Sequence, residues 1–307
     1  MSTPISISGL YKDTLNFVDE MAKKARLDRR LPQGADFTAE EMKALQEQLH
    51  ALTIFPTDKR DWFYLAFTAR HLPSLVDAIR TTSRETQRKA FSSYIQLLSL
   101  LPDPERNPYL RKFLLSERAS GLPNIVAQAF NDGVEWLRPS GPGPLAALLR
   151  NLLQWCDTEM GDDKRASIDK ARRDRLARKL GMIMANERFK NFELVHKVEV
   201  EMLHKLLNAI DVMETPAGEE EGDASEGEDG APAAGSEGEA PKPGYLLRST
   251  REYLKEKIPG QYECNVCMEE DAELRCAKCK AVKYCSKECQ MQDWKGGHRM
   301  QCYEAVF

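Results

Sequence analysis

Eight residues with thiol or imidazole side chains lie close together in the sequence, at spacings typical of zinc ligands. They follow the pattern C-x2-C-x8-C-x2-C-x5-C-x3-C-x8-H-x3-C. The residues are Cys264, Cys267, Cys276, Cys279, Cys285, Cys289, His298 and Cys302. Because a structural zinc ion takes four nitrogen or sulfur ligands in a tetrahedron, eight such residues predict two zinc ions. Protein atoms would fill every coordination position, so we expect structural sites with no catalytic water.

The use of cysteine favours a reducing compartment. Seven of the eight cysteines belong to this pattern, and Cys156 lies in an apolar helical stretch where a small buried side chain is expected. The first residues, MSTPISISGLYKDTLNF, lack the basic head and apolar run of a signal peptide. We therefore expect an intracellular chain, cytoplasmic or nuclear and not secreted. No run approaches 18 apolar residues, so no membrane association is expected.

The ligand pattern and the residues within it resemble a MYND zinc finger. The resemblance is carried by the pair Tyr284-Cys285, by the stretch Cys289-Gln-Met-Gln-Asp-Trp294 and by His298-x3-Cys302. Histidine is the seventh ligand here, whereas RING fingers usually have it fourth. The resemblance implies that the ligand pairs interleave. One zinc ion would be held by Cys264, Cys267, Cys285 and Cys289, and the other by Cys276, Cys279, His298 and Cys302.

The same resemblance implies a ligand for the finger. MYND fingers commonly bind short proline-rich segments through the glutamine and tryptophan of this stretch, which are Gln290 and Trp294 here. An extended proline-rich peptide loses little entropy when it docks on an exposed aromatic face. The alternative is that Trp294 fills the small core of the finger. One departure from the family is that three residues, 295–297, separate Trp294 from His298, where two are usual.

Local patterns predict how the second half of the finger is built. Ser286 can cap a helix that runs through Lys295, which places Cys285 and Cys289 one turn apart. Gly296 and Gly297 are then expected to break this helix and turn the chain toward His298.

The charge of the finger argues against nucleic-acid binding. Between Tyr262 and Phe307 there are seven basic and eight acidic residues, a net of −1. Seven thiolates and two Zn²⁺ would lower this to about −4. Such a domain lacks the electrostatic footprint that phosphates require, so no DNA is expected at the finger.

Residues 1–215 predict a mainly α protein with an all-α domain at its start. Apolar residues recur every three to four positions, and strand signals are absent. Thr38 and Glu41 form a predicted capping box, and Ser83 is expected to begin a helix that stops before Pro102. The segments 71–79 and 121–129 share a proline, Pro73 and Pro123, that is expected just inside a helix start and is followed by an aliphatic stripe. This sequence similarity leaves two hypotheses open for the fold of the helical domain, an armadillo-like solenoid and an irregular helical bundle.

Three further segments complete the expected organisation. Residues 216–244 carry nine acidic residues, all between Pro216 and Ala240, and no aliphatic side chain larger than alanine. They predict a disordered acidic linker that lets the finger move freely. Residues 245–260 are expected to hold a short helix, and 261–307 the MYND finger.

No motif in the sequence indicates an enzyme. Phosphate-binding loops, nucleophile elbows and zinc-protease motifs are missing, as is the cofactor signature of the SET methyltransferases that contain MYND fingers. We expect a scaffold or adaptor with one partner on the helical domain and a proline-rich partner on the finger. The architecture is similar to that of fungal proteins with helical repeats and a MYND finger, some of them adaptors in ubiquitin-ligase assemblies. The alternative is an enzyme, or a ubiquitin-ligase component, with an unrecognised site among the helices.

Overall fold

The computed structural model describes residues 7–32, 34–134, 141–156, 168–209, 258 and 263–307. The predicted acidic linker, 216–244, lies outside the described residues. So does the predicted helix within 245–260, apart from Ile258, which packs against the core.

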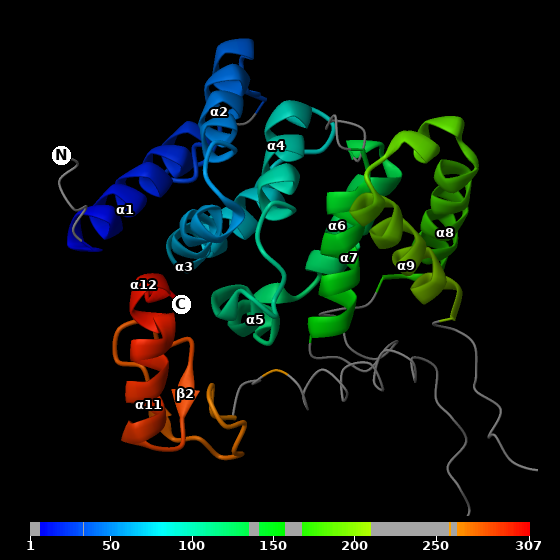
Figure 1. Ribbon diagram of the computed structural model, residues 1–307. Helices are drawn as coiled ribbons and strands as arrows, with labels where there is room; N and C mark the ends of the chain where they lie inside the picture. The colour runs from blue at the N-terminus through cyan, green and yellow to red at the C-terminus, as the bar shows by residue number, and fades with distance from the viewer. Residues whose placement is uncertain (1–6, 33, 135–140, 157–167, 210–257, 259–262) are drawn as a thin grey trace, which may run out of the picture.

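The part of the chain before the finger is all-α in its described residues, as predicted. Figure 1 shows it running from α1 and α2 at one end of the molecule to α8 and α9 at the other. Its helices are α1 (Ile7–Lys24), α2 (Ala39–Leu52), α3 (Thr57–Thr81), α4 (Arg88–Leu98), α5 (Pro108–Leu114), η1 (Glu117–Ala119), α6 (Leu122–Asn131), α7 (Gly143–Trp155), α8 (Lys170–Ala185), η3 (Glu187–Asn191) and α9 (Leu194–Ala209).

Side chains at the helix starts explain several boundaries. The predicted capping box of α2 is confirmed: Thr38 Oγ1 accepts from the Glu41 N–H at 3.2 Å, and Glu41 Oε2 accepts from the Thr38 N–H at 2.9 Å. The predicted helix start at Ser83 is wrong, because α4 begins at Arg88. Ser83 Oγ instead accepts the N–H groups of residues 85 and 86 and holds a turn, which competes with helix formation.

Pro73 does not begin a helix, although the similarity between segments 71–79 and 121–129 predicts that it does. It lies in the interior of α3, whereas Pro123 occupies the first turn of α6. The two prolines are therefore not equivalent, and the sequence similarity of the two segments does not indicate a repeated helix pair. A proline has no N–H to donate to the carbonyl four residues earlier, so Pro73 leaves the Ala69 carbonyl oxygen without its helical partner. Val306 supplies the missing donor, with its N–H 3.1 Å from that oxygen.

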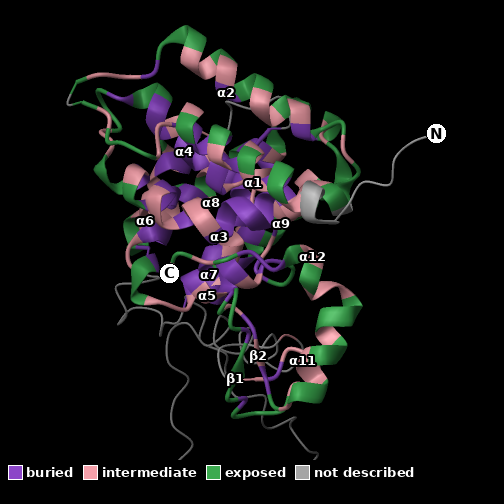
Figure 2. Cartoon of the chain, turned by 90° about the vertical axis from the view of Figure 1, so that its left-hand side faces the viewer, coloured by how far each residue is buried: buried purple, intermediate pink, exposed green. Residues whose placement is uncertain are grey.

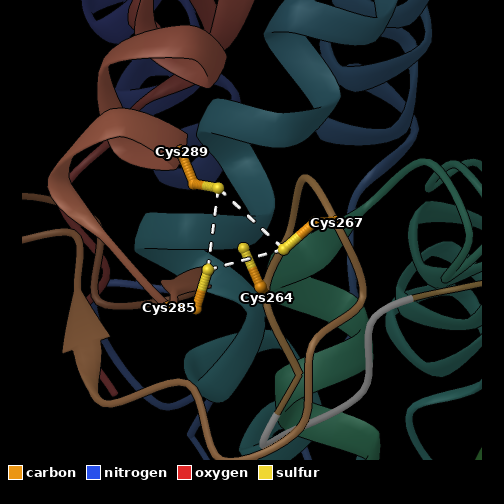
Figure 3. Close-up of side chains that lie close together, drawn as sticks. All are labelled: Cys264, Cys267, Cys285 and Cys289. Carbon is orange, nitrogen blue, oxygen red and sulfur yellow. Dashed lines mark hydrogen bonds between the residues drawn. The ribbon is translucent and has the colours of Figure 1, made fainter.

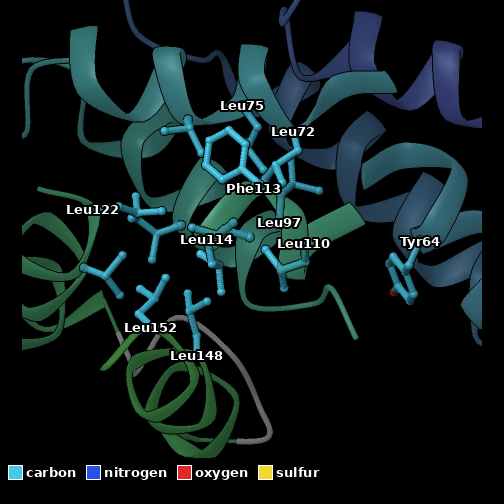
Figure 4. Close-up of a cluster of buried hydrophobic side chains, with 14 of the residues drawn as sticks. Tyr64, Leu72, Leu75, Leu97, Leu110, Phe113, Leu114, Leu122, Leu148 and Leu152 are labelled. Carbon is cyan, nitrogen blue, oxygen red and sulfur yellow. The ribbon is translucent and has the colours of Figure 1, made fainter. Parts of the chain in front are cut away.

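The helices enclose one continuous apolar core. Figure 4 shows part of it, where α3, α4, α5, α6 and α7 meet. Fully or nearly fully buried side chains here include Leu72, Leu97, Phe113, Leu122 and Leu152. The same cluster continues into the finger, where Tyr284 and Tyr303 are buried. Figure 2 shows the buried residues concentrated along the middle of the helical domain.

The finger is built from a two-stranded hairpin and a broken helix. The antiparallel hairpin pairs Leu274 with Tyr284 and Arg275 with Lys283. Its elements are β1 (Leu274–Arg275), β2 (Lys283–Tyr284), α11 (Lys287–Asp293), the π-helical turn η4 (Trp294–His298) and α12 (Arg299–Gln301). Figure 1 shows α12 beneath α3, with the rest of the finger hanging below it.

The residues that follow α12 attach the finger to the helical domain. The Tyr303 N–H donates to the Tyr109 hydroxyl at 2.7 Å, and that hydroxyl is 2.8 Å from the Gln301 carbonyl oxygen. The ring of Tyr303 stacks on Tyr11, with centroids 5.2 Å apart. Phe307 packs edge to face against Phe113 on α5, with centroids 5.6 Å apart. The expectation of a freely moving finger is therefore wrong, because the finger and the helices share one core.

Candidate metal centres and peptide-binding face

The first group of candidate ligands contains four thiols from two separate parts of the finger. Cys264 and Cys267 come from the loop before β1, Cys285 directly follows β2, and Cys289 lies in the first turn of α11. Figure 3 shows the four sulfur atoms pointing toward one centre. The Sγ atoms of Cys267 and Cys285 are 3.4 Å apart, and those of Cys285 and Cys289 are 3.6 Å apart.

The second group combines three thiols with the imidazole. Cys276 and Cys279 lie in the loop that joins β1 to β2, His298 ends η4, and Cys302 follows α12. His298 Nε2 lies 3.4 Å from Cys276 Sγ and 3.6 Å from Cys279 Sγ. The Sγ atoms of Cys276 and Cys302 are 3.6 Å apart. The structure thus brings the eight predicted residues together in the two interleaved sets that the resemblance implied.

Both groups fit a zinc ion. With Zn–S bonds of about 2.3 Å, the edge of a regular ZnS₄ tetrahedron is about 3.8 Å. All ligand atoms within each group lie within 4.8 Å of one another, and the cysteines are free thiols. Burial opposes ionisation of Cys264, but hydrogen bonds from several backbone N–H groups, those of Cys267 and Cys285 first, and from the Cys267 side chain together lower its pKa to about 6. A thiolate is the form that binds metal.

A kinked helical turn positions the histidine. Ser286 caps α11 as predicted, with its Oγ accepting the Cys289 N–H at 3.2 Å. The predicted break at the two glycines is confirmed at Gly297, whose backbone is non-helical and separates two helical segments. Gly297 has a φ of 143°, which only glycine adopts readily, and redirects the chain into α12.

Asp293 supports both halves of the finger from outside the ligand groups. Its Oδ2 accepts from the Tyr284 hydroxyl at 2.7 Å and from Asn265 Nδ2 at 3.0 Å. Burial and the neighbouring Asp293 carboxylate raise the pKa of Tyr284, so this hydroxyl stays protonated and donates. These contacts fix β2 and the first ligand loop against α11. The sequence indicated that Asp293 matters to the finger, because this residue belongs to the MYND-like stretch. No sequence pattern indicated that Asn265 would be its partner.

Trp294 is exposed and does not fill the core of the finger. The side chain is 43% exposed, and Met291, one turn earlier, is 57% exposed. Gln290 is half-buried on the same helix. The buried apolar side chains of the finger include Tyr284 and Val282. Trp294 packs its ring at 5.9 Å from the ring of His298, which fixes one edge and leaves the rest accessible.

Comparison with known proteins identifies the finger. The MYND finger family model matches residues 264–302, so this stretch is a MYND finger. The chain is 48% identical over 40 residues to ubiquitin carboxyl-terminal hydrolase 19 of Arabidopsis thaliana, covering 13% of this chain and 6% of the relative. It is 39% identical over 71 residues to Tudor domain-containing protein 1 of Oryzias latipes, covering 23% of this chain and 6% of the relative. No solved structure shows significant similarity.

These matches cover too little of each relative for its function to be assigned to this chain. A third relative, ubiquitin carboxyl-terminal hydrolase 17 of Arabidopsis thaliana, is 36% identical over 62 residues, which is 19% of this chain and 8% of the relative. The chain thus spans less than a tenth of the length of these relatives. The ubiquitin hydrolases match the finger only, so the finger is a shared module and not their enzymatic domain. Within the described residues, no helix has the length and apolar character needed to cross a membrane.

Proposed function

We propose that this chain is an intracellular, cytoplasmic or nuclear scaffold whose MYND finger docks short proline-rich segments through Gln290 and Trp294. The observation that carries the proposal is the exposed Trp294 ring on a helix fixed at both ends. Cys289 precedes it in one ligand group and His298 follows it in the other. A rigid, exposed aromatic ring is the surface on which a proline-rich peptide packs at small entropic cost.

We further propose that the eight grouped cysteine and histidine side chains are the zinc ligands. A module with so few buried apolar residues has little core, so metal binding supplies much of its folding free energy, on the order of 10 kcal/mol per structural zinc ion. Its protein ligands leave no open position on either ion, which supports a binding role and not a hydrolytic one.

The zinc proposal predicts two tightly bound ions per chain. Cys276→Ser should lower the content to about one, because one tetrahedral site loses a ligand. Elemental analysis of the purified full chain measures this content. Cys156→Ala removes a buried thiol far from the finger in sequence and should leave both ions bound. A wild-type content of one ion or none would refute the two-site interpretation.

The peptide proposal predicts binding of a Pro-x-Leu-x-Pro peptide in the micromolar range. Trp294→Ala should weaken it about tenfold or more, since a central aromatic anchor carries much of the binding free energy. Titration calorimetry on the zinc-loaded chain measures the affinity, and elemental analysis verifies that both ions remain. Leu274→Ala, at another exposed apolar residue of the finger, is the matched control and should bind normally. Absence of binding across a varied proline-rich panel would contradict the proposal.

A second partner on the helical domain remains part of the proposal. Its best support is α9, where Leu194, Val195, Val198 and Met202 form an exposed apolar stripe at helical spacing. Polar replacements along this stripe should remove a partner captured by the full chain without altering peptide binding at the finger. One hollow among the described helices has a volume of about 220 Å³, is partly open to solvent and is lined by residues including Arg84, Arg88 and Asp132. The alternative remains an enzyme or ubiquitin-ligase component with its own site among the helices.

A further inference from the structure

A small hollow lies where the helical domain meets the finger, and its walls are basic. Its volume is about 80 Å³. One wall is α5 and the residue after it, and the other is the β1–β2 hairpin of the finger. The lining residues are Pro108, Arg111, Lys112, Leu115, Arg275, Lys280, Ala281 and Lys283. Five of these carry a positive charge, and none of the described lining residues is acidic.

Two of the cations are held in place by main-chain oxygen atoms. Arg111 is buried, and its Nη1 donates to the Pro104 carbonyl oxygen at 2.7 Å. Burial lowers its pKa to about 10, so it keeps its charge at neutral pH. The peptide carbonyl of Pro104 carries no net charge, so it orients Arg111 without neutralising it. Lys112 is half-buried and donates to the main-chain oxygen of Phe307, the last residue of the sequence.

The other cations face them from the finger. Arg275 and Lys280 are exposed at the rim, and Lys283 is half-buried. Burial, and then the positive charge of Arg275, lower the pKa of Lys112, with a smaller contribution from Lys280. The charges of the two walls therefore act on one another across the hollow. Negative charges also act on this wall: Glu105 and Glu263 act on Arg111, and the sulfur of Cys279 acts on Lys112.

We propose that this hollow is an anion site that takes a phosphoryl group, either on a phosphorylated peptide or as a free phosphate. Like charges gathered in a partly desolvated space repel, and a dense anion removes that repulsion. The exposed guanidinium of Arg275 can hold phosphate oxygens bidentately, while Arg111 and the ammonium groups contribute their positive charge. The volume suits one compact group and not a length of nucleic-acid backbone. The two walls come from different domains, so an occupant would also bridge the finger and α5.

The test uses three probes on the full, zinc-loaded chain in titration calorimetry. The probes are inorganic phosphate, a phosphoserine peptide and the same peptide without the phosphate. We expect the phosphopeptide to bind and its unmodified form not to bind. Inorganic phosphate binding as tightly as the phosphopeptide would identify the phosphoryl group alone as the ligand. A much tighter phosphopeptide would show that peptide residues also contribute.

A double variant locates the site. Arg275→Gln with Lys280→Gln removes two exposed rim charges and should weaken binding about tenfold or more, through lost charge-assisted hydrogen bonds. The matched control is Lys287→Gln with Arg299→Gln, which removes the same charge from exposed positions outside the hollow and should bind as the wild type does. Trp294→Ala should also bind phosphate normally, which separates this site from the peptide face. Elemental analysis confirms both zinc ions in every variant.

Three results would overturn the proposal. The first is that neither phosphate nor the phosphopeptide binds. The second is an equal loss in the double variant and its control, which would indicate attraction by overall charge alone. The third is an oligonucleotide that binds more tightly than the phosphopeptide and loses affinity in the double variant, which would make this surface a nucleic-acid contact.

Discussion

Asp293 connects the zinc ligands with the peptide face at the scale of single residues. The residue after it is Trp294, and its carboxylate holds Tyr284, next to Cys285, and Asn265, next to Cys264. Residues that fix the neighbours of metal ligands tune metal affinity although they touch no metal. Asp293 therefore helps to hold both the first ligand group and the helix that presents Trp294.

We predict that Asp293→Ala weakens zinc retention by the finger. It leaves the Tyr284 hydroxyl and the Asn265 amide without their acceptor, at a cost of about 1–3 kcal/mol in the free energy of unfolding. Zinc affinity should fall roughly 10–100-fold. Competition with a coloured chelator measures this. Gln292→Ala, at the exposed preceding position of α11, is the control, and equal zinc loss in both variants would contradict the role given to Asp293.

The kinked turn η4 is the element that directs His298 into the second zinc site. Trp294 and His298 lie at its two ends, and the non-helical Gly297 bends the chain directly before His298. A regular α-helix through the same residues would point His298 in another direction, because each residue of an α-helix turns the chain by about 100°. Of the two glycines, Gly297 has a positive φ and Gly296 does not.

We predict opposite effects of alanine at the two glycines. No atom lies within 4 Å of a Cβ added at either position, so steric clash plays no part. Gly297→Ala should destabilise the finger by about 1–3 kcal/mol, because its φ of 143° strains any residue with a side chain. Gly296→Ala should be neutral or stabilise it by roughly 0.5–1 kcal/mol. Chemical denaturation with zinc present measures both, and similar midpoints would show that η4 does not depend on the conformation of Gly297.

At the scale of the whole molecule, the finger and the helical domain form one body. Pro73 leaves the Ala69 carbonyl oxygen free within α3, and the Val306 N–H occupies it. Tyr109 binds the backbone on both sides of Cys302, a member of the second ligand group. A partner on the helices and a peptide on Trp294 would therefore be held in a fixed relative orientation.

We predict that Tyr109→Phe loosens this attachment. The Tyr303 N–H and the Gln301 carbonyl lose their partner, which should cost about 1–3 kcal/mol and speed hydrogen exchange at the amides of Tyr303 and Val306. Tyr94→Phe is the matched control: Tyr94 is also buried, and its hydroxyl makes no hydrogen bond to the described residues. Unchanged exchange at Tyr303 in the Tyr109 variant would show that the ring contacts alone hold the finger.

Local patterns in the sequence determined the ligand set and the helical character of the chain. The spacing of the cysteines and of His298, and the stretch that ends in Trp294, identify the finger because metal coordination demands these residue types at these intervals. The capping box at Thr38 and the cap at Ser286 follow in the same way, since each involves residues three apart in the chain.

Only the tertiary structure decided how the finger is placed and what surrounds it. The contact between Tyr109 and Tyr303 joins residues 194 positions apart, and no local pattern encodes such a pair. The sequence predicts a helix start at Pro73 because proline favours that position, but buried residues on both sides of it belong to one continuous helix, α3. The basic hollow likewise exists only because α5 and the hairpin meet. Spacing along the chain predicts local geometry and metal ligands, whereas contacts between distant segments depend on the packing of the complete core.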